Sequence, residues 1–264
     1  MGPLVVYLGS LGSLIVNQLA GQVAKTFASY ATLQILVFVA PLVASFLFVR
    51  LLEKTSFWSS VGFKGTSWPQ VILFSLILNF VSYLASASLF MIGEYLTPRL
   101  PEVARYDPGA VQTAFRGLPR AAYWYMVFTS LVYAGFGEEV IFRGYILTRL
   151  LRRGRLFAIL ASAVMWSSLH LWYLPALGST GIWQHVDVLL IGVLFGVAYV
   201  RMRSILPLII VHAYTDMVLP LSFLYPGGVV DVGAFAVLTA GFAASVGYCA
   251  YWLYRRLARS RPSV

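Results

Sequence analysis

The stretch Gly137–Gly144, with the sequence GEEVIFRG, places two carboxylates and a guanidinium inside a long apolar segment. Ionisable side chains are costly within a membrane, and where they occur they mark a functional site by default. The segment around this stretch, 121–150, is otherwise apolar enough to cross a bilayer. We therefore take Gly137–Gly144 as the candidate functional centre and interpret the rest of the chain around it.

The composition is that of a membrane protein. The chain has 264 residues, of which 60% are hydrophobic and 11% are charged, and its mean hydropathy is +0.82. Soluble domains carry about 25% charged residues. The deficit extends along the whole sequence, and the polar loops are too short to form a separate soluble domain. We expect an all-α, polytopic helix bundle that forms a single membrane-embedded domain over 1–264.

Hydropathy predicts about eight transmembrane helices, since a spanning helix needs about 20 largely apolar residues. Seven is the alternative, because Asn17, Gln18 and Gln22 dilute the first segment. The predicted segments are 4–24, 29–50, 68–92, 121–150, 157–175, 185–200, 204–224 and 232–254.

The positive charge predicts an orientation. The net charge is +10, and lysines and arginines collect in alternate turns and after the last segment, which places both termini in the cytoplasm. We expect an integral, multi-pass protein, in the inner (plasma) membrane if the source is bacterial. Anionic lipid and orientation explain the basic charge. No basic run is interleaved with aromatic residues, so we expect membrane lipid as a partner and no nucleic acid.

The carboxylates of the central stretch differ in their expected roles. Residues four apart share a face of a helix, so Glu139 and Arg143 are expected to pair, with the acid in the favourable N-terminal position. Glu138 is directed elsewhere. We expect Arg143 to neutralise Glu139, so that the pair is structural, and Glu138 to be the reactive carboxylate, placed as a general base in an apolar setting.

A second motif follows on the next predicted span, where Trp166 and His170 share a helix face. The turn between the two spans is centred near Gly154, and Glu138 and His170 lie at equal sequence separations on either side of it. An antiparallel hairpin would bring them to the same depth. The spacing is what a catalytic pair requires.

The third motif is His212 and Asp216, which again share a face, on the span 204–224. An acid one turn from a histidine can fix its tautomer and hold its ring. The single cysteine, Cys249, excludes an intrachain disulfide and any multi-cysteine metal site. Gly192 and Gly196 form a small-xxx-small pair that predicts close helix packing.

Taken in order, these motifs resemble the CAAX-protease and bacteriocin-processing family, which consists of intramembrane endopeptidases and includes the Ras-converting prenyl-protein proteases. The resemblance covers 138–216, under a third of the chain. The family's second motif usually opens with phenylalanine, and its third often ends in asparagine. The three motifs here are Glu138-Glu139-x-x-x-Arg143, Trp166-x-x-x-His170 and His212-x-x-x-Asp216.

The resemblance implies that Glu138 and His170 activate water for attack on a peptide carbonyl. It implies that His212 and Asp216 help to bind the developing oxyanion; an ionised Asp216 would instead orient His212. The expected substrate is a membrane-anchored or lipid-modified protein, cleaved near its C-terminal tail or at a leader. The supporting residues are expected to be Glu139, Arg143 and Trp166.

Zinc is the open alternative to a metal-free site. The family is often labelled metalloprotease, and Glu138, His170 and His212 could supply the His₂Glu ligands of a catalytic zinc. No HExxH motif is present, and the resemblance to a glutamate-activated, metal-free site is at least as good, so we expect no cofactor.

Two other classes of function compete with the peptidase. A transporter or proton relay also uses buried acids and histidines, although the sequence shows neither the inverted repeat nor the paired broken helices of many transporters. A membrane scaffold that binds a partner without cleaving it is the third class. All the catalytic positions expected from the resemblance are filled.

Overall fold

A computed structural model describes residues 61–63 and 66–259, together with a few isolated positions before residue 52. Every regular element in these parts of the chain is helical, which confirms the all-α prediction for them. The predicted segments 4–24 and 29–50 lie largely outside the described residues, so the count of eight spans stays a prediction. Four described helices are long and apolar enough to cross a membrane. They are α4 (Trp68–Leu96), α10 (Ser179–Met202), α11 (Leu206–Leu224) and α12 (Val229–Arg259).

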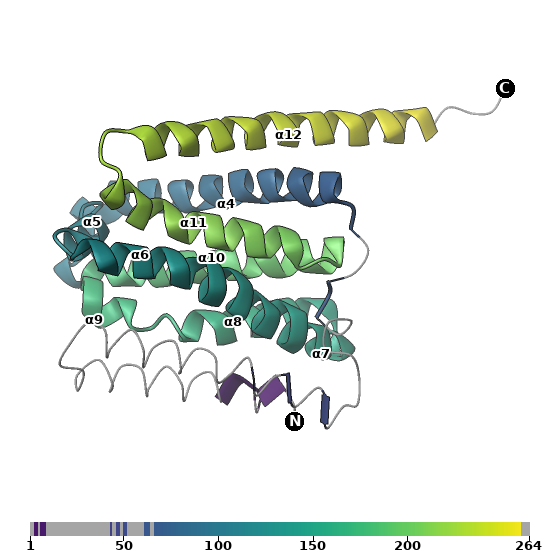
Figure 1. Cartoon of the computed structure of the whole chain (residues 1–264), viewed down its shortest axis with the longest axis horizontal. Helices are drawn as coiled ribbons and strands as arrows, with labels where there is room; N and C mark the ends of the chain where they lie inside the picture. Colours follow the sequence, from purple (N-terminus) through teal and green to yellow (C-terminus); the bar gives the residue numbers. More distant parts are fainter. Residues whose placement is uncertain are drawn as a thin grey trace.

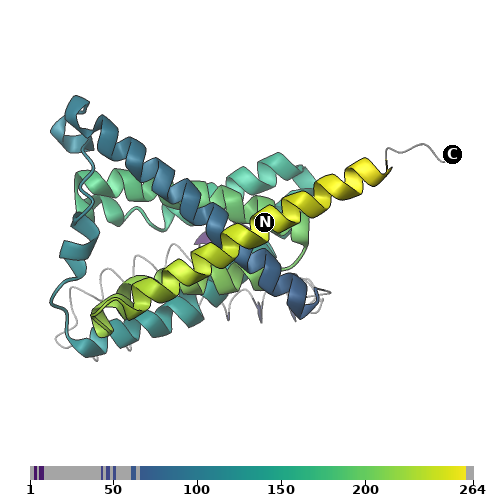
Figure 2. The ribbon, with the colours of Figure 1, turned by 90° about the horizontal axis from the view of Figure 1, so that it is seen from above.

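The long helices are stacked in layers, with α12 outermost, α4 beneath it, and α11 and α10 further in (Figure 1). Seen from above, α12 crosses α4 (Figure 2). The two helices touch where Gly241 faces α4, with an added Cβ coming 2.8 Å from the Cβ of Phe80. Many other side chains of α12 within 229–255 are apolar and exposed, for example Phe235 at 72% and Tyr254 at 69%. Such a surface suits contact with lipid chains.

The predicted span 121–150 is a continuous helical run but not a uniform α-helix. It begins as α6 (Arg120–Thr129), widens into the π-helical segments η4 (Ser130–Glu138) and η5 (Val140–Leu147), and closes as α7 (Thr148–Leu150) and the 3₁₀ turn η6 (Leu151–Arg153). π-helical turns are rare and concentrate at functional sites. The sequence analysis did not predict these π-helical turns at the central stretch.

The predicted C-terminal end of the span 157–175 was wrong, because the helix ends earlier. α8 (Arg155–Ser168) stops before His170, and a tight turn leads into the short helix α9 (Tyr173–Leu177). The backbone amide of His170 donates to the carbonyl oxygen of Ser167 at 2.8 Å, which closes that turn. His170 therefore lies on irregular backbone within the bundle.

The loop after α4 is fastened to the start of α10. The indole nitrogen of Trp183 donates to the carbonyl oxygen of Ala104 at 2.9 Å, and the ring of Tyr106 stacks on Phe90 with the centroids 5.2 Å apart. The short helices of this loop are η2 (Thr97–Arg99), η3 (Glu102–Ala104) and α5 (Ala110–Phe115).

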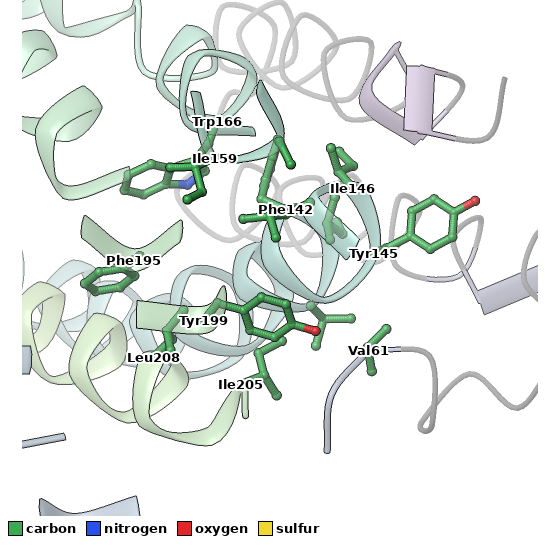
Figure 3. Packing of buried hydrophobic residues seen from close by; sticks show 14 of the residues in the cluster. Val61, Phe142, Tyr145, Ile146, Ile159, Trp166, Phe195, Tyr199, Ile205 and Leu208 are labelled. Atoms are coloured by element: carbon green, nitrogen blue, oxygen red, sulfur yellow. The ribbon is translucent and has the colours of Figure 1, made fainter. Parts of the chain in front are cut away.

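The core forms around η5, whose residues are all buried. Side chains from α8, α10 and α11 pack on it, including Trp166, Phe195 and Leu208 (Figure 3). α8 and α10 approach closely at two glycines, as their spacing predicted. A Cβ added at Gly192 would lie 3.0 Å from the Trp166 ring, and one at Gly196 would lie 3.1 Å from Ile159.

Candidate active site

Glu138 ends η4 and is buried, with only 4% of its surface exposed. One of its carboxylate oxygens, Oε2, accepts a hydrogen bond from Nε1 of Trp166 on α8. The same oxygen lies 4.0 Å from Nε2 of His212 on α11. Three segments that are distant in the sequence therefore meet at this carboxylate.

Glu139 is completely buried and accepts two hydrogen bonds at one oxygen. Its Oε1 accepts from Nη1 of Arg143 at 3.0 Å and from Nδ1 of His212 at 2.8 Å. The structure thus contains the Glu139–Arg143 pair that the sequence predicted, and adds a role for Glu139. Because a carboxylate only accepts hydrogen bonds, Nδ1 of His212 carries the proton, and Nε2 faces Glu138.

Arg143 is also completely buried. Besides its ion pair, its guanidinium carbon lies 4.3 Å from the centroid of the Trp166 ring and 5.5 Å from that of Phe195. These are cation–π contacts, which strengthen when the cation is removed from water. One carboxylate and two aromatic faces therefore hold this charge in the core.

Trp166 is the side chain that connects the site. Its ring meets the rings of His170 and His212 edge-on, at centroid distances of 5.1 and 5.4 Å, and it also donates to Glu138 and covers Arg143. No hydrogen bond joins Glu138 directly to His170 among the residues that the structure describes. His170 instead directs Nδ1 at the carbonyl oxygen of Trp166, 3.2 Å away.

Asp216 lies at the open side of the site. Its Oδ2 is 3.7 Å from Nε2 of His212, and 44% of its side chain is exposed, whereas only 7% of the His212 side chain is exposed. The sequence suggested that Asp216 could orient His212. In the structure, the carboxylate that holds the His212 ring by a hydrogen bond is that of Glu139, and the bond is made at Nδ1. Asp216 is the carboxylate nearest to solvent.

Gly135 allows η4 and α11 to pack closely against each other. A Cβ added there would lie 2.6 Å from the Cβ of Ala213 and 2.9 Å from the carbonyl oxygen of Ile209. The bare glycine backbone lets η4 lie against α11, which brings Glu138 next to His212. The sequence interpretation missed Gly135, although a glycine within an apolar segment is a signal of close packing. It also missed Phe195, for which the sequence carries no signal.

The three side chains that could hold zinc in the alternative mechanism, Glu138, His170 and His212, are not gathered around one point among the described residues. In the part of the chain that the structure describes, no three histidine, cysteine, aspartate or glutamate side chains are close enough together to hold a metal ion. Glu138 and His212 approach to 4.0 Å, but Nδ1 of His170 is directed at a backbone carbonyl.

Part of the chain matches a family of known proteins. Residues 120–218 match the family model described as Type II CAAX prenyl endopeptidase Rce1-like. This segment is similar to that family. It runs from α6 to within α11 and contains all three motifs, so the resemblance predicted from the sequence is confirmed. No curated protein and no solved structure matches the chain. The Rce1-like segment supports a protease of the CAAX type, and together with the four long apolar helices it indicates an integral membrane protein.

Proposed function

We propose that this chain is an intramembrane endopeptidase. Its substrate is a membrane-anchored or lipid-modified protein, cleaved near its C-terminal tail or at a leader. The observation that carries the proposal is the buried carboxylate of Glu138, which Trp166 and His212 meet from two other helices. The family match of residues 120–218 supports the same class of reaction.

The proposed reaction begins with water held between Glu138 and His170. Glu138 accepts one proton of the water as general base, and the hydroxide oxygen attacks the carbonyl carbon of the scissile bond. The carbonyl oxygen becomes an oxyanion, which Nε2 of a protonated His212 stabilises by donating a hydrogen bond. The proton on Glu138 then passes to the leaving amine as the C–N bond breaks.

The buried ion pair of Glu139 and Arg143 orients His212 for this reaction. Glu139 accepts from Nδ1 of His212 and so presents Nε2 to the substrate side. The carboxylate also stabilises a second proton on the imidazole, which is the form that can donate from Nε2. Arg143 offsets the charge of Glu139. Asp216, whose side chain is partly exposed, lies next to His212 at the side of the site nearest to solvent.

The cellular setting is part of the proposal. We propose that the whole chain forms one peptidase domain in the membrane, with both termini in the cytoplasm and membrane lipid as a partner. In a bacterium this would be the inner membrane. The positive turns between the predicted spans support the orientation.

Replacing Glu138 by glutamine tests the base. Glutamine has nearly the same shape and still accepts a hydrogen bond from Trp166, but it cannot take a proton from water. We expect the rate of cleavage by the purified full chain to fall by about 10²–10⁴-fold. The substrates are a prenylated CAAX peptide and a leader peptide, each with a matched unmodified or scrambled form. Glu94→Gln, at an exposed position, is the control and should keep full activity. Undiminished cleavage by Glu138→Gln would remove the base assignment.

Chelation tests the proposed absence of a metal. We expect the rate of cleavage to be unchanged after prolonged dialysis against a strong zinc chelator, with no stoichiometric metal found by elemental analysis. Loss of activity in chelator, restored by added zinc, would contradict the metal-free mechanism and favour a site of the His₂Glu kind.

A further inference from the structure

A pocket of about 340 Å³ opens between the start of α8 and the end of α10. None of the candidate active-site residues lines it. Trp166 lies eleven residues along α8 from Arg155, or about 16 Å at the rise of an α-helix. We call this cavity the arginine pocket. The residues that line it are Arg155, Ile159, Val197, Val200, Arg201 and Arg203.

Three positive charges converge on the arginine pocket. The side chains of Arg155, Arg201 and Arg203 are exposed. The ion pairs found among the described residues involve Arg143 and His212, and none of these three arginines. Within the described part of the chain these guanidinium groups have no acidic partner, and such groups are suited to the planar, bidentate recognition of a phosphate.

The backbone at Arg203 has an unusual conformation. Arg203 caps α10 in the left-handed conformation, with φ at 56°, and no other non-glycine residue in the described part of the chain has a positive φ. Glycine is the usual residue at such a helix end, because a Cβ is strained there. Arg203, which lines the pocket, therefore occupies a position where an arginine costs backbone stability.

The other residues that line the pocket are apolar, and the helix α8 also carries exposed apolar side chains outside it. Ile159, Val197 and Val200 form its apolar wall. Along α8, the large side chains Leu160 and Val164 are 45% and 55% exposed. A ligand that suits both parts has an anionic head and a hydrocarbon tail, and basic pockets between membrane helices bind such lipids.

We propose that the arginine pocket binds the phosphate headgroup of an anionic phospholipid, with one acyl chain lying along the exposed apolar face of α8. The lipid would join the start of α8 to the end of α10. These two helices hold Trp166 between them, because the Trp166 ring packs on Gly192. Bound lipid should therefore stabilise the folded chain.

The test uses the full chain, purified in detergent and stripped of lipid. Phosphatidylglycerol is titrated against it, with phosphatidylcholine and inorganic phosphate in parallel, and binding is followed by native mass spectrometry and by melting temperature. We expect phosphatidylglycerol to bind and to raise the melting temperature. In Arg201→Gln/Arg203→Gly its affinity should fall by about thirtyfold, at about fivefold for each charge removed.

Two single variants separate binding from folding. Arg203→Gly should weaken phosphatidylglycerol binding by about fivefold, yet leave the lipid-free melting temperature unchanged or higher, because glycine relieves the left-handed strain. Arg152→Gln removes an exposed charge that does not line the pocket, and it should bind lipid as the unaltered chain does.

The proposal is wrong if Arg201→Gln/Arg203→Gly binds phosphatidylglycerol as tightly as the unaltered chain. It is equally wrong if Arg152→Gln loses as much affinity as the pocket variants, since the effect would then be one of general surface charge. Equal binding of phosphatidylcholine would exclude recognition of anionic lipid. Equal stabilisation by inorganic phosphate would assign the pocket to free anions instead of lipid.

Discussion

Replacing Arg143 by methionine would leave Glu139 as an unneutralised carboxylate in the core. Both side chains are completely buried, with Nη1 and Oε1 3.0 Å apart. Removing one partner of a buried ion pair destabilises a protein by about 3–5 kcal/mol. Loss of the contact between the guanidinium and the Trp166 ring, at 4.3 Å, adds about 1 kcal/mol. At about 2–4 °C for each kcal/mol in a chain of this size, the melting temperature should fall by about 10–20 °C.

The matched variants are Glu139→Gln and the double substitution Glu139→Gln/Arg143→Met. The double variant has no buried charge at this position, and a glutamine at 139 still accepts from Nδ1 of His212. Replacing both members of a buried pair is often nearly neutral, so most of the lost stability should return. Thermal unfolding of all four proteins in one detergent completes a double-mutant cycle, with an expected coupling of about 2 kcal/mol or more.

Two results would refute this reasoning. One is a melting temperature for Arg143→Met within about 2 °C of that of the unaltered chain, which corresponds to less than about 1 kcal/mol. The other is a double variant less stable than Arg143→Met alone. Either would mean that the charge of Glu139 is satisfied in another way.

Three further substitutions test the packing around the site. Trp166→Phe removes the N–H that Glu138 accepts, so turnover should fall by about tenfold or more while the chain stays folded, since hydrogen bonds to charged groups contribute about 1.5–3 kcal/mol; unchanged turnover would contradict the role of the indole. Gly135→Ala places a Cβ 2.6 Å from a side-chain atom of α11 and should lower the free energy of unfolding by about 1–3 kcal/mol. Gly247→Ala, where a Cβ meets nothing within 4 Å, is its control in thermal unfolding and should be neutral. Gly192→Ala places a Cβ 3.0 Å from the Trp166 ring. We expect kcat to fall while the melting temperature changes little, and parallel kinetic and melting measurements test this.

Local spacing was enough to predict the side-chain pairs that form within one helix. Glu139 and Arg143 are four apart, and they pair even though the helix there is wider than an α-helix. His212 and Asp216, also four apart, lie within 3.7 Å of each other. Such pairs depend on one helix only, so sequence periodicity predicts them. The resemblance to the CAAX-type proteases depends on the same short motifs, and the family match of 120–218 confirms it.

The extent of the helices was harder to predict. Hydropathy does not distinguish α-helical from π-helical backbone, because both bury the same apolar side chains, and it therefore missed η4 and η5. It also extended α8 past Ser168, since the residues that follow are apolar although the chain turns there. Both errors lie next to Glu138 and His170, where the backbone departs from regular geometry.

By itself, the sequence determined the helical class, the membrane character and the identity of the charged and imidazole groups, because each of these follows from composition and from contacts within one helix. The tertiary structure alone decided which groups touch. It placed Glu139 on Nδ1 of His212 and Trp166 against Glu138. These contacts join segments far apart in the chain, and they depend on how closely η4 approaches α11 at Gly135, a distance set by three-dimensional packing that no periodicity encodes.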